Sequence, residues 1–426
     1  MLILSIAPMF AGVSFAEEDF SVPPEIKSAS AIVMKSDTGQ VLYEKEPDIA
    51  AYPASITKIM TALLVLEKLP LDQVLTMDEE VEAVNEAQIY LRTGEEITVR
   101  DLLYAMMLAS ANDAAVALAK GVSGSVPNFA AEMNAKAKEI GATATNFVNP
   151  NGLPDPAHVT TARDFALITK EAMKNDSFRQ IVQSGEYTIP KNNKNWERRV
   201  VNTHELLFSY PGTNGVKTGT LDDTKTLVTS ANRDGRELIV VVMGGTPYNR
   251  DVYTDTEALL NYGFYGFTDV QLFTPDVCSA DIAVTKGQQE KTSLVVKKPV
   301  IVCLPNASVG QITYAYDVPE SVAAPVEKGA KIGKVKAMLG ETQLAERNLI
   351  ADAGVAKTLN LFERAGLETD SVVTIIKIIA AVIILIIIIF IIVLIRARRD
   401  NINRRTKRMR WGKASAIQVK RVKRIK

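Results

Sequence analysis

Histidine and cysteine are scarce in this sequence. Its 426 residues include two histidines, His158 and His204, and two cysteines, Cys278 and Cys303. A Ser-His-Asp hydrolase needs a histidine base, but we expect both histidines to be surface or packing residues. The cysteines could pair outside a cell, although we expect two unpaired, buried thiols. There is no cluster of metal ligands and no glycine-rich phosphate loop, so the sequence predicts neither a metal site nor a cofactor.

Charge is unevenly distributed along the chain. The formal net charge is +0, yet residues 396–426 contain 14 lysines and arginines and a single acid, Asp400. The rest of the chain is therefore acidic, and we expect no nucleic-acid partner. With 47% apolar residues, the chain is long enough to form two or three domains with their own cores.

A long apolar run separates the acidic part of the chain from the basic tail. Ile378–Ile395 are 18 consecutive apolar residues, and the run extends back to Val372 if Lys377 snorkels. A helix of this extended length spans about 36 Å, which is enough to cross a hydrocarbon core of about 30 Å. We predict a transmembrane helix over residues 372–395 with the basic tail, 396–426, in the cytoplasm and the preceding chain outside. We expect the tail to fix this topology and to contact anionic lipid, and a specific cytoplasmic partner is the alternative.

The first residues are typical of a secretory leader. Residues 1–16 are mostly apolar and end in Ser14-Phe15-Ala16, a small-x-small cleavage pattern. We therefore predict a signal peptide over 1–16, although it lacks the usual basic n-region. A short N-terminal core strand is the alternative.

The chain between these two ends shows two kinds of pattern. Residues 29–43 alternate apolar and polar side chains around Thr38-Gly39, which predicts a β-hairpin with its turn there. With the helical and strand patterns that follow, residues 27–270 predict an α/β or α+β domain with helices flanking an antiparallel sheet. Residues 275–357 form short Val/Thr/Lys-rich runs broken by prolines, which predicts a small all-β domain. A connector over 358–371 leads to the transmembrane helix.

Three short motifs stand out in the larger domain. They are Ser55-Ile56-Thr57-Lys58, Ser110-Ala111-Asn112 and Lys217-Thr218-Gly219. Residues three apart share one face of a helix, so Lys58 can reach the Ser55 hydroxyl. A lysine can accept the serine proton only if burial and nearby positive charge lower its pKa. Lys217 could supply that charge.

The second and third motifs are suited to binding a substrate. Ser110 and Asn112 are two residues apart, which favours a turn where the hydroxyl relays a proton and the amide holds a substrate backbone group. Lys217 and Thr218 offer a cation and a hydroxyl to a carboxylate, and Gly219 leaves room for a peptide along the strand. Each motif alone is weak, but chance should rarely produce all three in this order and context.

Together the motifs resemble those of the low-molecular-weight penicillin-binding proteins, the serine-type D-alanyl-D-alanine carboxypeptidase family. The resemblance covers about residues 29–267 and includes Pro53–Thr61, Ser110–Ala114, Asn151–Leu153, Thr160–Asp164 and Asn214–Thr220. It implies a penicillin-binding/β-lactamase-like catalytic domain followed by the small β domain. It also implies that the protein removes the terminal D-alanine from peptidoglycan stem peptides ending in D-Ala-D-Ala, binds β-lactam antibiotics and serves cell wall remodelling.

The resemblance also implies which residues carry the reaction. Ser55 would be the acylated nucleophile and Lys58 its general base, while Ser110 would pass a proton to the leaving D-alanine. The backbone N–H groups of Ser55 and Thr220 would form the oxyanion hole.

The remaining implied roles concern substrate binding. Asn112 would bind the substrate amide, and Lys217 with Thr218, beside Gly219, would bind the terminal carboxylate. Arg250 is a further candidate for this carboxylate, although its spacing to the following Leu-Leu pair is longer than the family pattern.

Three other functions stay open on the sequence alone: a non-catalytic envelope scaffold on the same fold, a DD-endopeptidase and a β-lactamase-like hydrolase. Every matched catalytic side chain is present, which argues against the scaffold. No convincing glutamate offers itself as a fast deacylating base, which argues against the β-lactamase. The stretch at 221–226, Leu-Asp-Asp-Thr-Lys-Thr, replaces a small Ala/Gly-containing stretch of the family and leaves fine specificity open.

Overall fold

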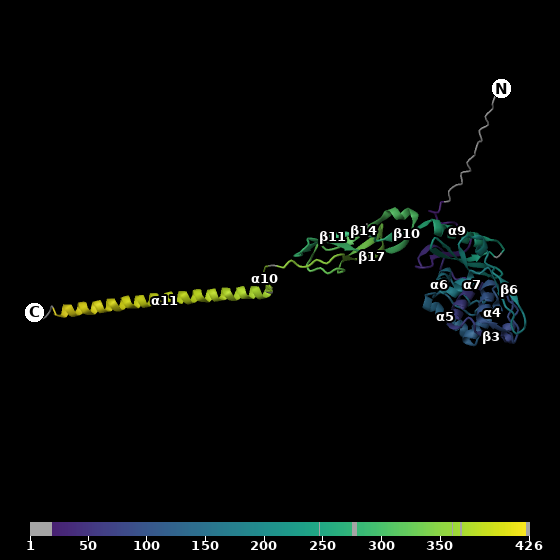
Figure 1. The fold of residues 1–426 in the computed structure, drawn as a ribbon, viewed down its shortest axis with the longest axis horizontal. Coiled ribbons are helices and arrows are strands. Elements are labelled where there is room, and N and C mark those ends of the chain that lie inside the picture. Colours follow the sequence, from purple (N-terminus) through teal and green to yellow (C-terminus); the bar gives the residue numbers. More distant parts are fainter. Residues whose placement is uncertain (1–18, 247, 275–278, 360, 367–368, 423–426) are drawn as a thin grey trace, which may run out of the picture. The chain divides into compact units, whose positions relative to one another are not determined.

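The computed structural model describes residues 19–246, 248–274, 279–359, 361–366 and 369–422 (Figure 1). The predicted signal peptide, 1–16, and Cys278 lie outside the described residues. The chain divides into two compact units. The first runs to Leu272 and adds Val300–Thr313 and Ala337–Leu344, while the second holds Phe273–Pro299, Tyr314–Lys336 and the chain from Ala345 onward.

A five-stranded antiparallel sheet forms the centre of the first unit. Its strand order is β2-β1-β9-β8-β7, with bounds β1 (Ser30–Lys35), β2 (Val41–Lys45), β7 (Thr213–Thr220), β8 (Lys225–Arg233) and β9 (Arg236–Gly245). The pairing of β1 with β2 confirms the predicted hairpin, whose turn contains Gly39 at φ +78°. The strand β7 carries the Lys-Thr-Gly motif and is the last strand of this sheet, so it pairs with β8 alone.

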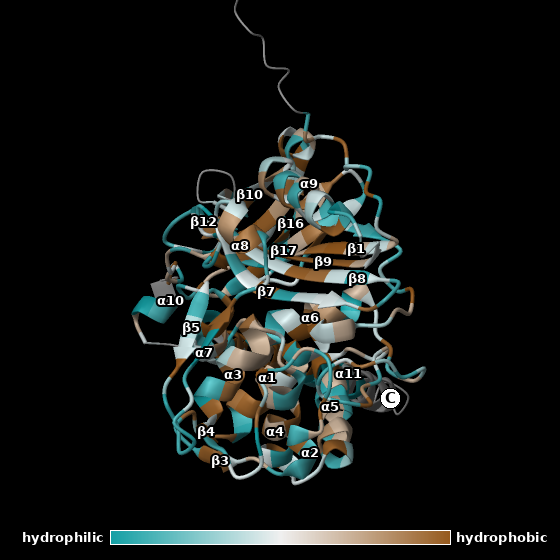
Figure 2. Ribbon diagram, turned by 90° about the vertical axis from the view of Figure 1, so that its right-hand side faces the viewer, coloured by the Kyte–Doolittle hydropathy of each residue, from teal (hydrophilic) through white to brown (hydrophobic). Residues whose placement is uncertain are grey.

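Both faces of this sheet are buried, which explains the continuous apolar run in β9. Side chains alternate along a strand: Ile239 and Val241 pack into the core formed with most of the helices, whereas Val240 and Val242 pack with α9 (Asp251–Tyr265). Figure 2 shows the apolar strands β1 and β9 inside the sheet. The sheet therefore separates two apolar cores.

The remaining elements of the first unit surround the sheet or extend beside it. Several helices begin at side-chain caps; for example, the hydroxyl of Thr98 accepts the N–H of Asp101 at 3.1 Å. The bounds are η1 (Ala54–Thr57), α1 (Lys58–Lys68), β3 (Val74–Thr76), α2 (Glu79–Glu82), β4 (Glu96–Thr98), α3 (Val99–Leu108), α4 (Asn112–Ser123), α5 (Val126–Ile140), α6 (Ala162–Ala172), α7 (Asp176–Val182), β5 (Glu186–Ile189), β6 (Arg198–Val201), α8 (Leu206–Ser209), β10 (Phe267–Leu272), β13 (Val300–Pro305) and η2 (Asn306–Gln311).

The second unit is rich in strands, and some of its strands extend into segments assigned to the first unit. A six-stranded sheet has the order β14-β16-β17-β12-β11-β15, with bounds β11 (Ala280–Thr285), β12 (Lys291–Val295), β14 (Ile312–Asp317), β15 (Ser321–Ala323), β16 (Lys331–Leu339) and β17 (Thr342–Ala351). A small apolar cluster that includes Val284, Val326 and Val355 is buried there. The prolines in the described part of this segment fall between strands or at their ends, because a proline cannot donate to a strand ladder.

The chain continues into α10 (Leu361–Arg364) and α11 (Thr369–Val422), the long helix shown in yellow in Figure 1. The span Asp370–Trp411 within α11 contains an 18-residue window with a mean hydropathy of 4.0, none of it buried against the rest of the protein. By length and composition it is the one helix of the described chain able to cross a membrane. The helix-flanked antiparallel sheet, the β-rich part and this apolar helix confirm the predicted fold class.

Candidate active site

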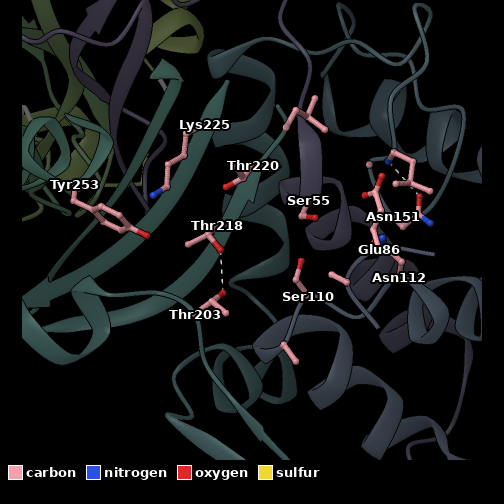
Figure 3. Close-up of a pocket in the computed structure, with 15 residues that line it drawn as sticks. Ser55, Glu86, Ser110, Asn112, Asn151, Thr203, Thr218, Thr220, Lys225 and Tyr253 are labelled. Carbon is pink, nitrogen blue, oxygen red and sulfur yellow. Dashed lines mark hydrogen bonds between the residues drawn. The ribbon is translucent and has the colours of Figure 1, made fainter. Parts of the chain in front are cut away.

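The three sequence motifs meet at one pocket of about 360 Å³ in the first unit (Figure 3). Its lining combines the turn before α1, the α3–α4 junction, strand β7 and the loop around Asn151. The residues that line it are Ser55, Glu86, Ala87, Ala109, Ser110, Asn112, Asn151, Gly152, Leu153, Thr203, Thr218, Thr220, Leu221, Lys225 and Tyr253. Lys58, Lys217 and Gly219 lie behind this surface, and Arg250 is not among the lining residues.

Ser55 and Lys58 lie on the short turn that leads into α1. Ser55 is part of the 3₁₀ turn η1, and Lys58 is the first residue of α1. The Nζ atom of Lys58 lies 3.0 Å from the Ser55 Oγ. The side chain of Lys58 is fully buried, so its amine is held in a fixed position beside the serine hydroxyl.

A neutral amine at Lys58 can make all three of its contacts. Its Nζ donates to the Asn112 Oδ1 at 2.8 Å and to the carbonyl oxygen of Asn151 at 2.7 Å. A neutral amine has two N–H donors and one lone pair, so these two acceptors leave the lone pair for the Ser55 hydroxyl. Burial holds the pKa of Lys58 well below its usual value, and the positive charge of Lys217 lowers it further. The arrangement can therefore remove a proton from Ser55.

Ser110 and Asn112 occupy the junction between α3 and α4. Ser110 has φ +60°, a left-handed conformation that few residues other than glycine adopt. Figure 3 shows its hydroxyl pointing toward Ser55. One N–H of the Asn112 side chain donates to the carbonyl oxygen of Asn85 at 3.2 Å, which leaves the second N–H for a ligand.

The Lys-Thr-Gly motif presents its side chains on opposite faces of β7. Thr218 lines the pocket, and its Oγ1 lies 3.0 Å from the Thr203 Oγ1. Lys217 is fully buried and donates to the carbonyl oxygen of Thr218 at 2.9 Å. Burial lowers the pKa of Lys217 to about 7. Its positive charge therefore acts on the site from the face of β7 opposite the pocket.

Two glycines allow the backbone to approach the Ser55 turn closely. A Cβ atom on Gly219 would lie 3.0 Å from the backbone N of Ser55 and would also overlap the Thr226 hydroxyl. A Cβ on Gly152 would overlap the carbonyl group of Ala54. The sequence explained Gly219 as room for a peptide. The structure adds that β7 packs directly on the turn that contains Ser55.

Both histidines are packing residues, as the sequence predicted. His158 accepts the N–H of Val148 on its Nδ1 at 3.1 Å, so its Nε2 carries the proton toward the Thr57 hydroxyl at 2.9 Å. Burial lowers the pKa of His158 and that of His204 to about 4, so both stay neutral at physiological pH. Within the described ranges, no three acidic, cysteine or histidine residues gather as metal ligands. Cys303 is buried and free.

Arg250 lies beside the pocket and is engaged with other side chains. It forms an ion pair with Glu205, and its guanidinium lies 5.3 Å from the ring centre of Tyr253. Lys225 reaches the pocket instead: its Nζ lies 4.6 Å from the centre of the same ring, and it pairs across the sheet with Thr220. Two cations therefore flank Tyr253, and Lys225 is the one that lines the cavity.

Sequence reasoning did not single out several of the lining residues. Asn151 lies in a segment that carried the family resemblance, and Lys225 lies in the stretch that departs from the family pattern. There was therefore a reason in the sequence to consider both residues as part of the site. For Glu86 there was no such reason, because its place in the pocket depends on contacts with a helix that begins 26 residues later, at Asn112. Its backbone has φ +66°.

Comparison with known proteins adds two family matches. Residues 17–246 match the model of the D-alanyl-D-alanine carboxypeptidase family, and residues 267–357 match that of the C-terminal domain of penicillin-binding protein 5. The first match covers more than half of the chain. Its residues include all three motifs.

Individual relatives agree with these matches. The D-alanyl-D-alanine carboxypeptidase DacF of Bacillus subtilis is 32% identical over 358 residues, which cover 82% of this chain and 91% of the relative. A D-alanyl-D-alanine endopeptidase of Pseudomonas aeruginosa is 34% identical over 216 residues, which cover 48% of this chain and 69% of the relative. The crystal structure of penicillin-binding protein 5 from Haemophilus influenzae is 28% identical with a TM-score of 0.63, covering 79% of this chain and 99% of that structure.

Proposed function

The chain belongs to the D-alanyl-D-alanine carboxypeptidase family and is a serine-type hydrolase of that class, and we propose that it works through an acyl-enzyme on Ser55. The substrate would be a peptidoglycan stem pentapeptide ending in D-Ala-D-Ala. The observation that carries this proposal is the 3.0 Å contact between the buried Lys58 amine and the Ser55 hydroxyl. β-Lactam antibiotics would acylate the same hydroxyl.

In the acylation step, Lys58 takes the Ser55 proton while the Ser55 Oγ attacks the carbonyl carbon of the penultimate D-alanine. The backbone N–H groups of Ser55 and Thr220 stabilise the oxyanion that forms. Ser110 passes the proton from Lys58 to the leaving nitrogen, the peptide bond breaks and free D-alanine departs. Water then attacks the ester carbon while Lys58 takes a proton from it, and Lys58 gives this proton to the Ser55 Oγ as the ester bond breaks, which releases the shortened peptide.

Substrate binding is assigned to the other side of the pocket. The free N–H of the Asn112 side chain binds the carbonyl on the acyl side of the scissile bond. Thr218 donates to the terminal carboxylate, and the charges of Lys217 and Arg250 favour binding of this anion. The position of Lys225 in the cavity supports a role beside them.

Release of D-alanine tests the proposed activity. The full-length protein in detergent is incubated with a pentapeptide ending in D-Ala-D-Ala, and the free D-alanine is measured. The proposal requires D-alanine to be released by the wild-type protein and not by Ser55→Ala. A wild-type protein that is inactive yet correctly folded would support the scaffold alternative. Cleavage of a cross-linked peptide dimer into two separate peptides, without release of D-alanine from the pentapeptide, would support the endopeptidase alternative.

The apolar span in α11 fits anchoring in a membrane, and we propose that the catalytic unit lies outside the cytoplasm. The basic tail after Ile395 supports this orientation, because lysine and arginine concentrate on the cytoplasmic side of a span. A protease added to spheroplasts should remove the catalytic unit and leave the tail intact. Digestion of the tail would contradict the proposed orientation.

A further inference from the structure

Glu86 lines the active-site pocket, yet the proposed reaction gives it no role. It lies beside Asn112 and Asn151, across the pocket from Lys225 (Figure 3). Its φ of +66° is left-handed, a conformation that costs free energy for a residue with a Cβ unless surrounding contacts stabilise it. The position of this carboxylate therefore depends on how its backbone is held.

Hydrogen bonds on both sides of Glu86 hold its backbone against the start of α4. The N–H of Asn112 donates to the carbonyl oxygen of Ala87 at 2.7 Å, and the Asn112 side chain donates to the carbonyl oxygen of Asn85 at 3.2 Å. Asp113 adds a second anchor, because its carboxylate accepts the N–H of Leu91 at 3.0 Å. The same asparagine that is assigned to the substrate amide thus fixes the residues on either side of Glu86.

The carboxylate of Glu86 is available to a ligand. Its side chain is exposed and makes no hydrogen bond or ion pair with any residue in the described part of the chain. Its charge favours the protonated form of Lys58, but burial outweighs it and the pKa of Lys58 stays well below the usual value. The three contacts of the Lys58 amine go to Ser55, Asn112 and Asn151.

We propose that Glu86 is a specificity residue that binds a free ammonium group on the acyl side of the substrate. The proposal rests on the proposed function. If Asn112 holds the carbonyl that precedes the penultimate D-alanine, the side chain of that preceding residue lies within reach of the neighbouring Glu86. A basic residue at that position would pair its ammonium with the carboxylate, whereas an acylated amine would lose this attraction.

A second acidic region offers a rival explanation for any preference of this kind. Asp222 and Asp223, in the turn between β7 and β8, line a neighbouring cavity with Asp155 and Tyr52. Leu221 lines both cavities, so a longer substrate could extend from one to the other. The test must therefore separate Glu86 from this turn.

The test compares two tripeptides with the full-length protein in detergent. One is Nα-acetyl-L-Lys-D-Ala-D-Ala, which keeps its side-chain ammonium, and the other is the Nα,Nε-diacetyl form. The wild-type protein should prefer the free ammonium in kcat/KM. Glu86→Gln should lower kcat/KM for that peptide about two- to fivefold, the range of a partly exposed charge pair. It should leave kcat/KM for the diacetyl peptide unchanged, because Gln keeps the shape of Glu and removes only the charge.

Two further variants complete the test. Glu79→Gln removes the same charge from an exposed position in α2 outside the pocket, and it should leave the preference unchanged. Asp223→Asn should also leave it unchanged.

Three results would overturn the inference: equal losses for both peptides in Glu86→Gln, which would mean that Glu86 acts through Lys58; loss of the preference in Asp223→Asn instead; or no preference in the wild-type protein. Failure of the wild-type protein to release D-alanine from either peptide is a different outcome, because it would refute the proposed function itself.

Discussion

The Nζ atom of Lys58 lies 3.0 Å from the Oγ of Ser55, at the first turn of α1. The other two contacts of this amine are both with hydrogen-bond acceptors, so a neutral lysine satisfies every contact and still points its lone pair at the serine. A charged ammonium would have to leave water for this fully buried position, which is unfavourable. The geometry and the lowered pKa of Lys58 therefore both support the proposal that Lys58 is the base.

The first prediction distinguishes Lys58 from Lys217. Lys58→Arg should abolish acylation by both peptide and penicillin, because a guanidinium with a pKa above about 12 cannot accept the serine proton. Lys217→Arg keeps the positive charge and should retain partial activity. Lys217→Ala should slow acylation by about one to two powers of ten, the cost of a charge-assisted contact of roughly 1.5–3 kcal/mol. Stopped-flow acylation measures all three. Near-native acylation by Lys58→Arg would rule Lys58 out as the base.

The second prediction concerns pH. The rate of acylation should rise with pH as Lys58 loses its proton. This rise should occur well below the pH at which an ordinary lysine loses its proton, because burial lowers the pKa of Lys58. The pKa of Lys217 is about 7, so its positive charge is present below pH 7 and lost above it. Binding of a peptide carboxylate should therefore weaken above about pH 7.

Lys217→Arg provides the control for this pH profile. An arginine stays charged, so the decline above neutral pH should disappear in this variant. The measurement is kcat/KM as a function of pH for the wild-type protein and for Lys217→Arg. An identical alkaline decline in both would mean that a group other than Lys217 causes it.

Much of this site could be predicted because its residues are close together in the sequence. Ser55 and Lys58 are three residues apart at a helix start, and Ser110 and Asn112 flank a helix junction, so local rules indicated that each pair lies close together. The roles proposed for these residues came from the family resemblance. The hairpin of β1 and β2 followed from its turn residues in the same way.

Other features of the site could not be predicted, because they depend on contacts between distant segments. The sequence did not indicate that Lys217 would be buried under its own strand, that Asn151 would accept a hydrogen bond from Lys58, or that Arg250 would pair with Glu205. These arrangements appear only when the sheet and helices pack together.

The third prediction concerns Gly219. Gly219→Ala should reduce acylation at least tenfold, because its Cβ would press on the backbone N of Ser55, which lies 3.0 Å from the Cβ position. A tenfold loss corresponds to about 1.4 kcal/mol of transition-state stabilisation. Gly310→Ala is a suitable control, because no atom lies within 4 Å of a Cβ built at that position. Acylation rates and thermal melting of both variants check the prediction, and a fully active Gly219→Ala would contradict it.

The fourth prediction asks which cation binds the substrate carboxylate. Lys225 lines the pocket, whereas Arg250 is paired with Glu205. We therefore expect Lys225→Met to raise KM for a peptide acid about tenfold and Arg250→Met to raise it less. The corresponding peptide amide, which lacks the carboxylate, should show little change in either variant. A larger effect of Arg250→Met on the acid would assign the main contact to Arg250.

The most direct test of the account is to identify the residue that a labelled penicillin acylates. The full-length protein is treated with the penicillin and digested, and the labelled peptide is sequenced by mass spectrometry. The account predicts one adduct on Ser55 and none in Ser55→Ala. An adduct on another residue, or undiminished labelling of Ser55→Ala, would contradict the assignment of Ser55 as the nucleophile.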